Sequence, residues 1–266
     1  MLTFGSSYEM MTYRTYFLCF LFCGITTPVH GTSIVAVWTQ SEVVIGADSK
    51  QITLDVGTTT KTTQSVCKIT RLGNLFYAYS GGVTESTKTG FNIQRISEEA
   101  FRSNLIILAK AQRFESLLEA PLIHTLEVMR KDNPAYFEKE RLKGEIVQML
   151  LVGLENGKLV LSVRGFKIVS LPAAPVQLQT SRRDCPSSEC SSEGTYILMG
   201  QHEAIDRELG VPLDNTIWSR GLVSAVNRLV SIEISEKSDV VGPPIDILRI
   251  NKDGAQWIQR KSECVG

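Results

Sequence analysis

The chain has 266 residues, of which 43% are apolar, and its 28 basic side chains equal its 28 acidic ones in number. This length allows one large hydrophobic core, and a single domain is favoured. The formal net charge of zero, without a cluster of Lys and Arg in the sequence, gives no electrostatic case for nucleic-acid binding, so no nucleic-acid partner is expected.

The first 31 residues have the layout of a secretory signal peptide. Arg14 is followed by an apolar run, Tyr16 to Ile25, and then by a polar stretch. We expect signal peptidase to cut between Gly31 and Thr32, so that residues 1–31 are removed and the protein is exported to the periplasm or the extracellular space. A retained membrane anchor is the alternative, although roughly ten apolar residues are short for a span. No later stretch approaches the ~18 apolar residues that a membrane-spanning helix needs.

Four cysteines remain after this segment, and an even number in an exported protein permits disulfides. Cys185 and Cys190 lie in a Ser/Pro-rich loop and are the best candidate pair. Cys67 and Cys264 would then pair by elimination. The spacings of cysteine and histidine do not fit a zinc site, and no metal is expected.

The first part of the mature chain has the pattern of β-hairpins. A β-branched run over Ser33–Trp38 and the segment Val43–Ser49 predict one hairpin. The Thr-rich segment 58–63 is predicted to be a polar turn. Residues 67–72 and 75–82 predict a second strand pair, turned at Gly73-Asn74.

A helical period follows, because apolar residues recur at threes and fours from Phe91 to Leu108. A second helix is predicted to begin near Pro121 and to stop before Asn133-Pro134. Together these segments predict a helical layer.

Strands and then helix return in the second half of the chain. The predicted elements are a hairpin over 145–169, a loop over 172–194, a strand over 195–200, a helix around 222–234 and a last hairpin over 245–260. Pairs of helices between runs of hairpins suit two mainly antiparallel sheets packed face to face, with helices outside each. They argue against a doubly wound parallel sheet, which needs single crossovers between strands. The predicted class is therefore α+β, with one domain over residues 32–266.

The common nucleophile motifs are missing from the sequence: there is no G-x-S-x-G, no H-E-x-x-H and no phosphate-binding loop. A histidine-based triad is also disfavoured. His30 lies in the predicted signal, His124 falls within a helical segment and His202 near a strand-to-helix turn. If the protein is an enzyme, another group must act as the base.

An N-terminal threonine can supply its own base. Cleavage at Gly31–Thr32 would free an α-amino group, which titrates near pH ~7.7–8.0 and can take the proton of the Thr32 hydroxyl. A nearby lysine would keep this amine neutral, and a carboxylate would hold the lysine charged. Backbone N–H groups of a Gly-rich turn could stabilise the oxyanion.

Four stretches carry a resemblance: "GTSIVAVW", "VVIGADSKQ", "VCKITRL" and "FYAYSGG". In this order they resemble the start of a proteasome β-subunit or of its bacterial two-component protease relative. The resemblance implies the four-layer αββα sandwich of the N-terminal nucleophile hydrolases. It also implies that Thr32 is the nucleophile, that Asp48 and Lys68 are the supporting pair, and that Gly81 provides the oxyanion hole.

The sequence departs from the family pattern at two places. Gln201 stands where the family has a Ser that helps to orient the amino group. Before the last hairpin the family has an Asp and, three residues later, a Ser; these positions fall on Ser238 and Val241. Asp239 is one residue away, and we include it among the candidate catalytic residues.

The resemblance implies a threonine-type peptidase or amidohydrolase that needs no cofactor. Peptides or other amides are the expected substrates, and a homo-oligomer, which could be a ring, is the expected assembly. No ATP-driven unfoldase is expected, because an exported protein has no ATP supply. The alternatives are a catalytically inactive, proteasome-like binding or assembly subunit, and an ordinary secreted binding domain in which Asp48, Lys68 and Gly81 lie far apart.

Overall fold

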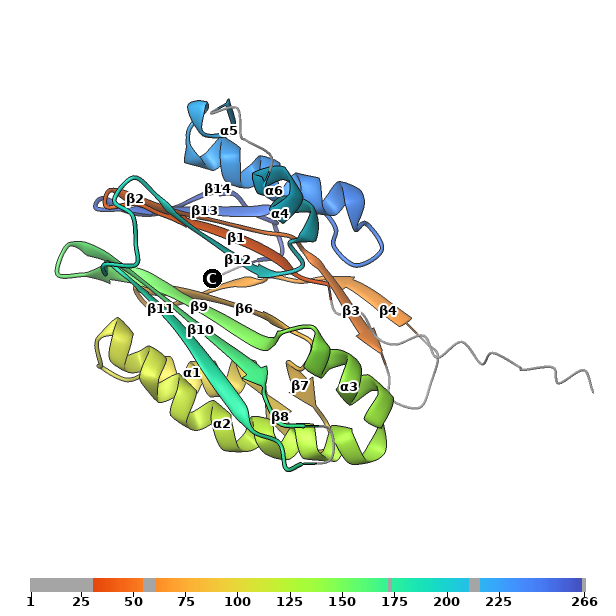
Figure 1. Ribbon diagram of the computed structural model, residues 1–266. Helices are drawn as coiled ribbons and strands as arrows, with labels where there is room; N and C mark the ends of the chain where they lie inside the picture. The colour runs from red at the N-terminus through yellow and green to blue at the C-terminus, as the bar shows by residue number, and fades with distance from the viewer. Residues whose placement is uncertain (1–30, 55–60, 172–173, 211–215, 265–266) are drawn as a thin grey trace, which may run out of the picture.

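Two five-stranded antiparallel sheets dominate the computed structural model, which describes residues 31–54, 61–171, 174–210 and 216–264 (Figure 1). The first sheet contains, in spatial order, β12 (Thr195–Gly200), β1 (Ser33–Trp38), β2 (Glu42–Ala47), β13 (Asp246–Asn251) and β14 (Gly254–Gln259). The second contains β11 (Leu178–Cys185), β10 (Lys158–Ile168), β9 (Glu145–Glu155), β6 (Leu75–Gly81) and β5 (Ile69–Leu72). Two small hairpins accompany them, β3 (Lys50–Leu54) with β4 (Lys61–Ser65) and β7 (Glu85–Ser86) with β8 (Phe91–Asn92).

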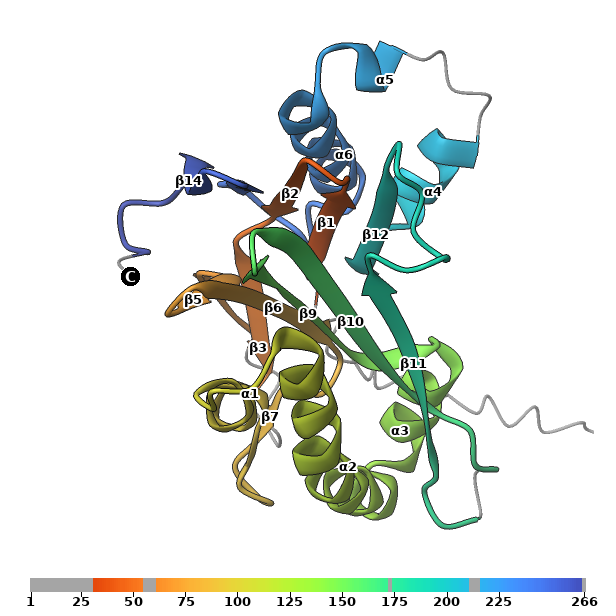
Figure 2. The same ribbon diagram turned by 90° about the vertical axis from the view of Figure 1, so that its left-hand side faces the viewer.

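Helices cover the outer face of each sheet, as Figure 2 shows. Over the first sheet lie α4 (Glu203–Gly210), α5 (Thr216–Ser219) and α6 (Leu222–Glu236). Over the second lie α1 (Ile93–Phe101), α2 (Ile107–Asp132) and α3 (Pro134–Leu142). The chain is thus an α+β protein with the layer order helix, sheet, sheet, helix.

Alternation along the strands explains why both faces of each sheet are buried. In β1, Ile34 and Ala36 face the second sheet, whereas Val35 packs against α6. In β6, Phe76 faces the first sheet and Tyr77 packs under α1 and α2. Successive strand side chains point to opposite faces, so a strand between a sheet and a helix must be apolar at nearly every position.

The two predicted cysteine pairs form disulfides. Cys185–Cys190 closes a loop beside β11, and Cys67–Cys264 joins two segments that are 197 residues apart in the chain. Such bonds are typical of proteins in oxidising compartments. Within the described part of the chain, no helix is long and apolar enough to cross a membrane.

The helical layer over the second sheet differs from the prediction. The helix predicted from Phe91 to Leu108 ends at Phe101, and the next helix, α2, begins at Ile107 rather than near Pro121. Pro121 therefore lies inside α2, where it removes a backbone donor but leaves the helix continuous. The predicted stop at Asn133 is correct. The missed α3 begins there, because the Asn133 side chain caps it and Pro134 occupies its first turn.

Two further predictions were wrong or incomplete. The loop predicted over 172–194 contains β11, which pairs with β10 along its full length. The sequence did not indicate β11, because this edge strand is polar and partly exposed. It is held to β10 through Asp184, which accepts hydrogen bonds from the side chains of Ser162 and Arg164. Of the predicted turn over 58–63, residues 58–60 lie outside the described residues, and Thr62 and Thr63 belong to β4.

We predict that Leu118→Ala will lower the free energy of unfolding by about 2–5 kcal/mol, because the substitution leaves a cavity among well-packed residues. Leu118 is 0% exposed in the core under α2, whereas Leu142 at the end of α3 is 70% exposed. Leu142→Ala is therefore the matched control, with an expected change of less than about 0.5 kcal/mol. Urea unfolding with the disulfides intact measures both. Similar losses in the two variants would contradict the assigned core.

Candidate active site

The predicted site residues come from segments that meet at one end of the two sheets. Thr32 directly precedes β1, Asp48 directly follows β2, Lys68 directly precedes β5 and Gly81 ends β6. This is the end from which β3 and β4 project in Figure 1. Because neighbouring strands are antiparallel, the starts of some strands and the ends of others gather at the same edge.

Asp48 is the centre of the hydrogen bonding at this edge. Its side chain is fully buried, and its carboxylate accepts four hydrogen bonds. Oδ1 accepts from the Ser33 N–H (2.8 Å) and from the Lys68 ammonium (2.5 Å). Oδ2 accepts from the N–H groups of Lys50 (3.0 Å) and Gly242 (3.1 Å). The carboxylate therefore fixes four separate chain segments relative to one another.

Lys68 forms a buried ion pair with Asp48 and points toward the peptide bond that precedes Thr32. Its Nζ lies 3.4 Å from the Gly31 carbonyl oxygen. The pKa of Lys68 is lowered from 10.5 to about 8: burial lowers it most, the Asp48 carboxylate opposes this, and the charge of Lys261 adds to the lowering. The ammonium thus lies next to the predicted cleavage site and can change its charge near neutral pH.

Two glycines allow the backbone around Thr32 to fit closely against its neighbours. The Thr32 carbonyl accepts a hydrogen bond from the Gln201 N–H (2.6 Å), and Gly200 just before it has a φ of +76°. A Cβ on Gly200 would overlap that carbonyl, and a Cβ on Gly31 would overlap the Val240 carbonyl. The backbone around the Gly31–Thr32 bond is therefore packed so closely that only glycine fits at positions 31 and 200.

Gly81 ends its strand close to the Thr32 segment. It pairs with Val147 of β9, and its φ of +149° together with a close approach to the Ile146 carbonyl disfavours any side chain there. The preceding residue, Ser80, lies against Gly200, which itself contacts Thr32. The structure thus brings Thr32, Asp48, Lys68 and the Gly81 strand end together.

Gln148 of β9 is a member of this site that the sequence did not indicate. Its Oε1 accepts hydrogen bonds from the Gly200 N–H (2.8 Å) and from the Ser80 hydroxyl (3.0 Å). Its Nε2 donates to Glu145 (2.7 Å). Gln148 therefore ties the second sheet to the turn that holds Thr32, and a polar residue within an otherwise apolar strand was the one available signal.

Asp239 occupies a different place from the other predicted residues. It is exposed, with Ser238, in the loop between α6 and β13. That loop reaches the site through other residues, since Val240 packs against Gly31 and Gly242 donates to Asp48. Val241 is buried among apolar side chains.

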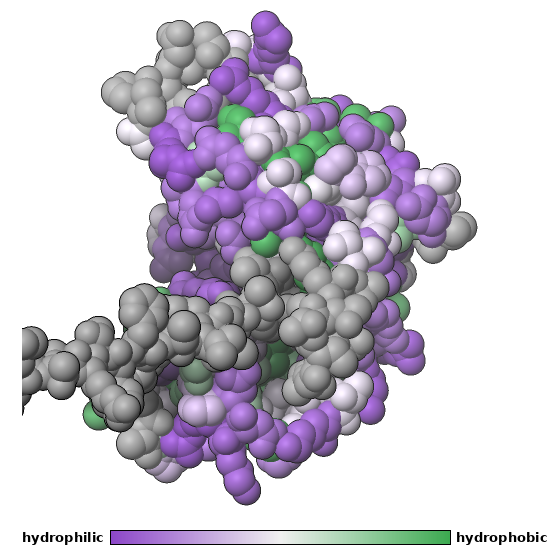
Figure 3. All heavy atoms as spheres, turned by 90° about the vertical axis from the view of Figure 1, so that its right-hand side faces the viewer, coloured by the Kyte–Doolittle hydropathy of each residue, from purple (hydrophilic) through white to green (hydrophobic). Residues whose placement is uncertain are grey.

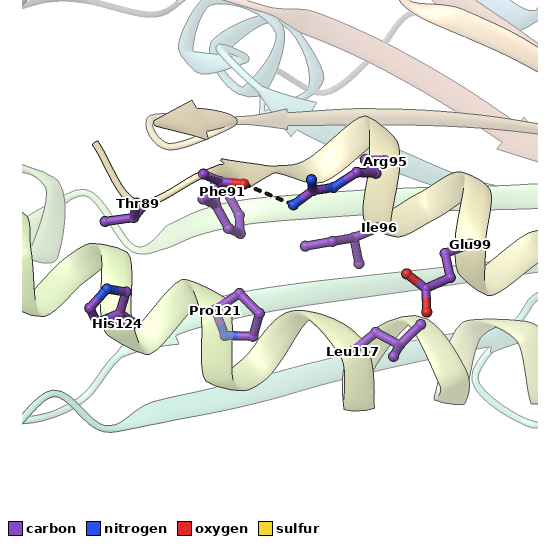
Figure 4. A pocket seen from close by; sticks show the side chains of 9 residues that line it. Thr89, Phe91, Arg95, Ile96, Glu99, Leu117, Pro121 and His124 are labelled. Carbon is purple, nitrogen blue, oxygen red and sulfur yellow. Dashed lines mark hydrogen bonds between the residues drawn. The ribbon is translucent and has the colours of Figure 1, made fainter. Parts of the chain in front are cut away.

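Other features of the described surface lie away from this edge. The pocket in Figure 4 is between α1 and α2, where Arg95, Glu99 and His124 line it. On the face shown in Figure 3, hydrophilic side chains predominate and apolar ones are scattered. Among the residues described, no group of three or more His, Cys, Asp or Glu side chains is arranged to hold a metal ion.

A scan against models of known protein families found no match to this sequence, and a search of curated proteins found none either. Function must therefore be inferred from the residues themselves. A buried carboxylate–ammonium pair beside a hydroxyl-bearing residue can tune proton transfer, and such perturbed pairs concentrate at functional sites.

We predict that Gly200→Ala will destabilise the protein by about 1–3 kcal/mol, since alanine is strained at this positive φ and would displace the Thr32 carbonyl. Gly210→Ala is the control, because no atom lies within 4 Å of a Cβ built at this exposed end of α4. Its effect should stay within about 0.5 kcal/mol. Thermal and urea unfolding compare the variants, and equal stabilities would contradict the close contact at Thr32.

Proposed function

We propose that the protein is an exported N-terminal threonine amide hydrolase with a proteasome-like, N-terminal nucleophile fold. One observation carries the proposal. The buried Asp48–Lys68 pair directs its ammonium at the Gly31 carbonyl, 3.4 Å away, and cleavage of the bond after Gly31 would make Thr32 the N-terminus. The four-layer arrangement and the two disulfides are compatible with this assignment.

The proposed reaction is acyl transfer in two halves. The α-amino group of Thr32 takes the hydroxyl proton, and Oγ forms an ester bond with the amide carbonyl carbon of the substrate. The C–N bond breaks and the amine leaves with the transferred proton. Water then attacks the ester, releasing the acid and restoring the hydroxyl. A backbone N–H at Gly81 would stabilise the oxyanion in both halves.

Lys68 and Asp48 have separate roles in this scheme. The positive charge of Lys68 lowers the proton affinity of the neighbouring amine, so that the amine is neutral and able to act as a base. Asp48 keeps Lys68 in place through the 2.5 Å contact and opposes the loss of its charge on burial. No cofactor takes part.

The proposal names only a broad class of substrates. Peptides or other small amides, or chains that are already unfolded, are the expected substrates. Assembly as a homo-oligomer, including a ring, belongs to the proposal, and an ATP-driven unfoldase does not.

A non-catalytic binding or assembly subunit is the second candidate, and a specific observation favours it. Val241 is buried and apolar where the resemblance predicts a Ser, and Gln201 replaces the other family Ser. A protein that keeps the fold but has lost these hydroxyls would retain the Asp48–Lys68 pair only for stability.

We predict that the purified, exported protein begins at Thr32 and that Thr32→Ala lowers kcat/KM on fluorogenic peptide amides by a factor on the order of 10³ or more. N-terminal sequencing and intact mass give the first result, and steady-state kinetics give the second. Thr32→Ser keeps a hydroxyl and should retain measurable activity. Thr87→Ala, at an exposed position near β7, is the control and should match the wild type. Full activity in Thr32→Ala, or a mature start elsewhere, would refute the mechanism.

We also predict a bell-shaped pH dependence of kcat/KM. Activity should rise with pH as the Thr32 amine loses its proton, because only the neutral amine can accept the hydroxyl proton. It should fall again above about 8, where Lys68 loses its charge. In Lys68→Arg the guanidinium stays charged, so the alkaline decline should disappear even if the overall rate is lower. An unchanged alkaline decline in this variant would show that another group causes it.

A further inference from the structure

A C-terminal segment, Lys261–Cys264, packs behind the Asp48–Lys68 pair and contributes a second buried ammonium. The Lys261 side chain is 1% exposed, and its Nζ lies 3.1 Å from Asp246 Oδ2. The same nitrogen donates to the Ser49 hydroxyl (2.6 Å) and to the Val66 carbonyl. Two hydrogen bonds and one ion pair thus compensate the buried charge of the ammonium.

Two of the three groups that Lys261 contacts, Ser49 and Val66, are close in sequence to the Asp48–Lys68 pair. Ser49 directly follows Asp48, and Val66 lies two residues before Lys68. The Val66 N–H donates to the Ser49 carbonyl (2.8 Å), so the two segments already touch here. Lys261 links the same two segments a second time, because its ammonium donates to the Ser49 hydroxyl and to the Val66 carbonyl.

Ser49 extends this bridge to the loop before β13. Its N–H donates to the Gly242 carbonyl (2.9 Å), and its hydroxyl donates to the Pro244 carbonyl while accepting from Lys261. Gly242 is also a hydrogen-bond donor to Asp48. Ser49 and Gly242 therefore connect the Lys261 ammonium to Oδ2 of the Asp48 carboxylate.

The disulfide Cys67–Cys264 anchors the same segment covalently. Cys67 directly precedes Lys68, and the Cys264 N–H donates to the Lys261 carbonyl (3.1 Å). The C-terminal segment is therefore attached one residue from Lys68 by a covalent bond, while Lys261 reaches the Asp48 side. A cross-link over so long a loop greatly restricts the chain.

Lys261 also acts on Lys68 through its charge. The groups that face the Lys68 ammonium are the Asp48 carboxylate, the Gly31 carbonyl and, across the Val66 segment, the Lys261–Asp246 pair. The positive charge of Lys261 lowers the pKa of Lys68, in the same direction as burial.

We propose that Lys261, held in place by the Cys67–Cys264 disulfide, is a positioning residue that fixes the location of the Asp48–Lys68 pair. Its effect on catalysis rests on the proposed function, whereas its effect on Lys68 does not.

The decisive measurement is the titration of Lys68 in the full-length protein, followed by ¹³C NMR of labelled lysine and assigned by loss of the signal in Lys68→Arg. In Lys261→Met the pKa of Lys68 should rise toward its ordinary value, because a like charge is removed and the site loosens. Lys261→Arg keeps the charge and should shift Lys68 less. Lys110→Met is the matched control, since Lys110 also donates to two backbone carbonyls, those of Phe101 and Ser103, but lies in the outer helical layer. It should leave the pKa of Lys68 unchanged.

Kinetics on peptide amides give the second readout. Lys261→Met should lower kcat by up to about 10²-fold, the cost typical of small misplacements, and should move the alkaline limb of the pH profile upward. Replacing both Cys67 and Cys264 with Ser should act in the same direction, whereas replacing both Cys185 and Cys190 with Ser should not. If Lys261→Met does not fold, Lys261→Arg and the Cys67/Cys264 variant carry the test.

The two proposals fail in different ways. An unchanged Lys68 pKa in both Lys261→Met and the Cys67/Cys264 variant would overturn the positioning role, whatever the activity. Full activity in Thr32→Ala together with a shifted Lys68 pKa would refute the hydrolase and leave the positioning role standing.

Discussion

The structure around the candidate site depends on one buried ion pair. Asp48 and Lys68 are both removed from water, and an isolated charge at either position would be costly. Their 2.5 Å contact offsets part of that cost. The three backbone N–H groups that donate to the Asp48 carboxylate offset a further part. Those donors come from β1, from the start of β3 and from the loop before β13. The need to satisfy this carboxylate therefore aligns strands from distant parts of the chain at a single edge.

The glycines near the pair follow from the same constraint. Once Ser33 and Gly242 are fixed on Asp48, the backbone of Thr32 has little room, and it must pass between the Gly200 turn and the Val240 carbonyl. A side chain at Gly31 would overlap the Val240 carbonyl, and one at Gly200 would overlap the Thr32 carbonyl. The close approach of Lys68 to the Gly31 carbonyl is thus a result of packing on both sides of the chain and not of the ion pair alone.

Much of the fold could be predicted from the sequence, because a strand buried on both faces leaves a long β-branched run, as in Ser33–Trp38. The same holds for the hairpins over 145–169 and 245–260, whose turns carry Gly157 and Gly254. The elements that were not predicted lack such a sequence pattern. The edge strand β11 is half exposed and polar, and α2 passes through Pro121, where sequence rules place a boundary. The Asp48–Lys68 contact was expected only through a resemblance, since local patterns carry no information on pairs that are 20 residues apart. Gln148 had only a weak signal, a polar residue within an apolar strand, and nothing in the sequence around Lys261 marks it.

The Cys67–Cys264 bond has a consequence for the order in which the protein can be completed. Strands β1, β2, β5 and β6 lie early in the chain, and β13 and the Lys261–Cys264 segment lie last. During synthesis from the N-terminus, Asp48 and Lys68 are present long before Gly242, Lys261 and Cys264. The contacts of Gly242 with Asp48, and of Lys261 with Ser49 and Val66, can therefore form only after the last part of the chain has been made, so the two halves of this edge come from opposite ends of synthesis.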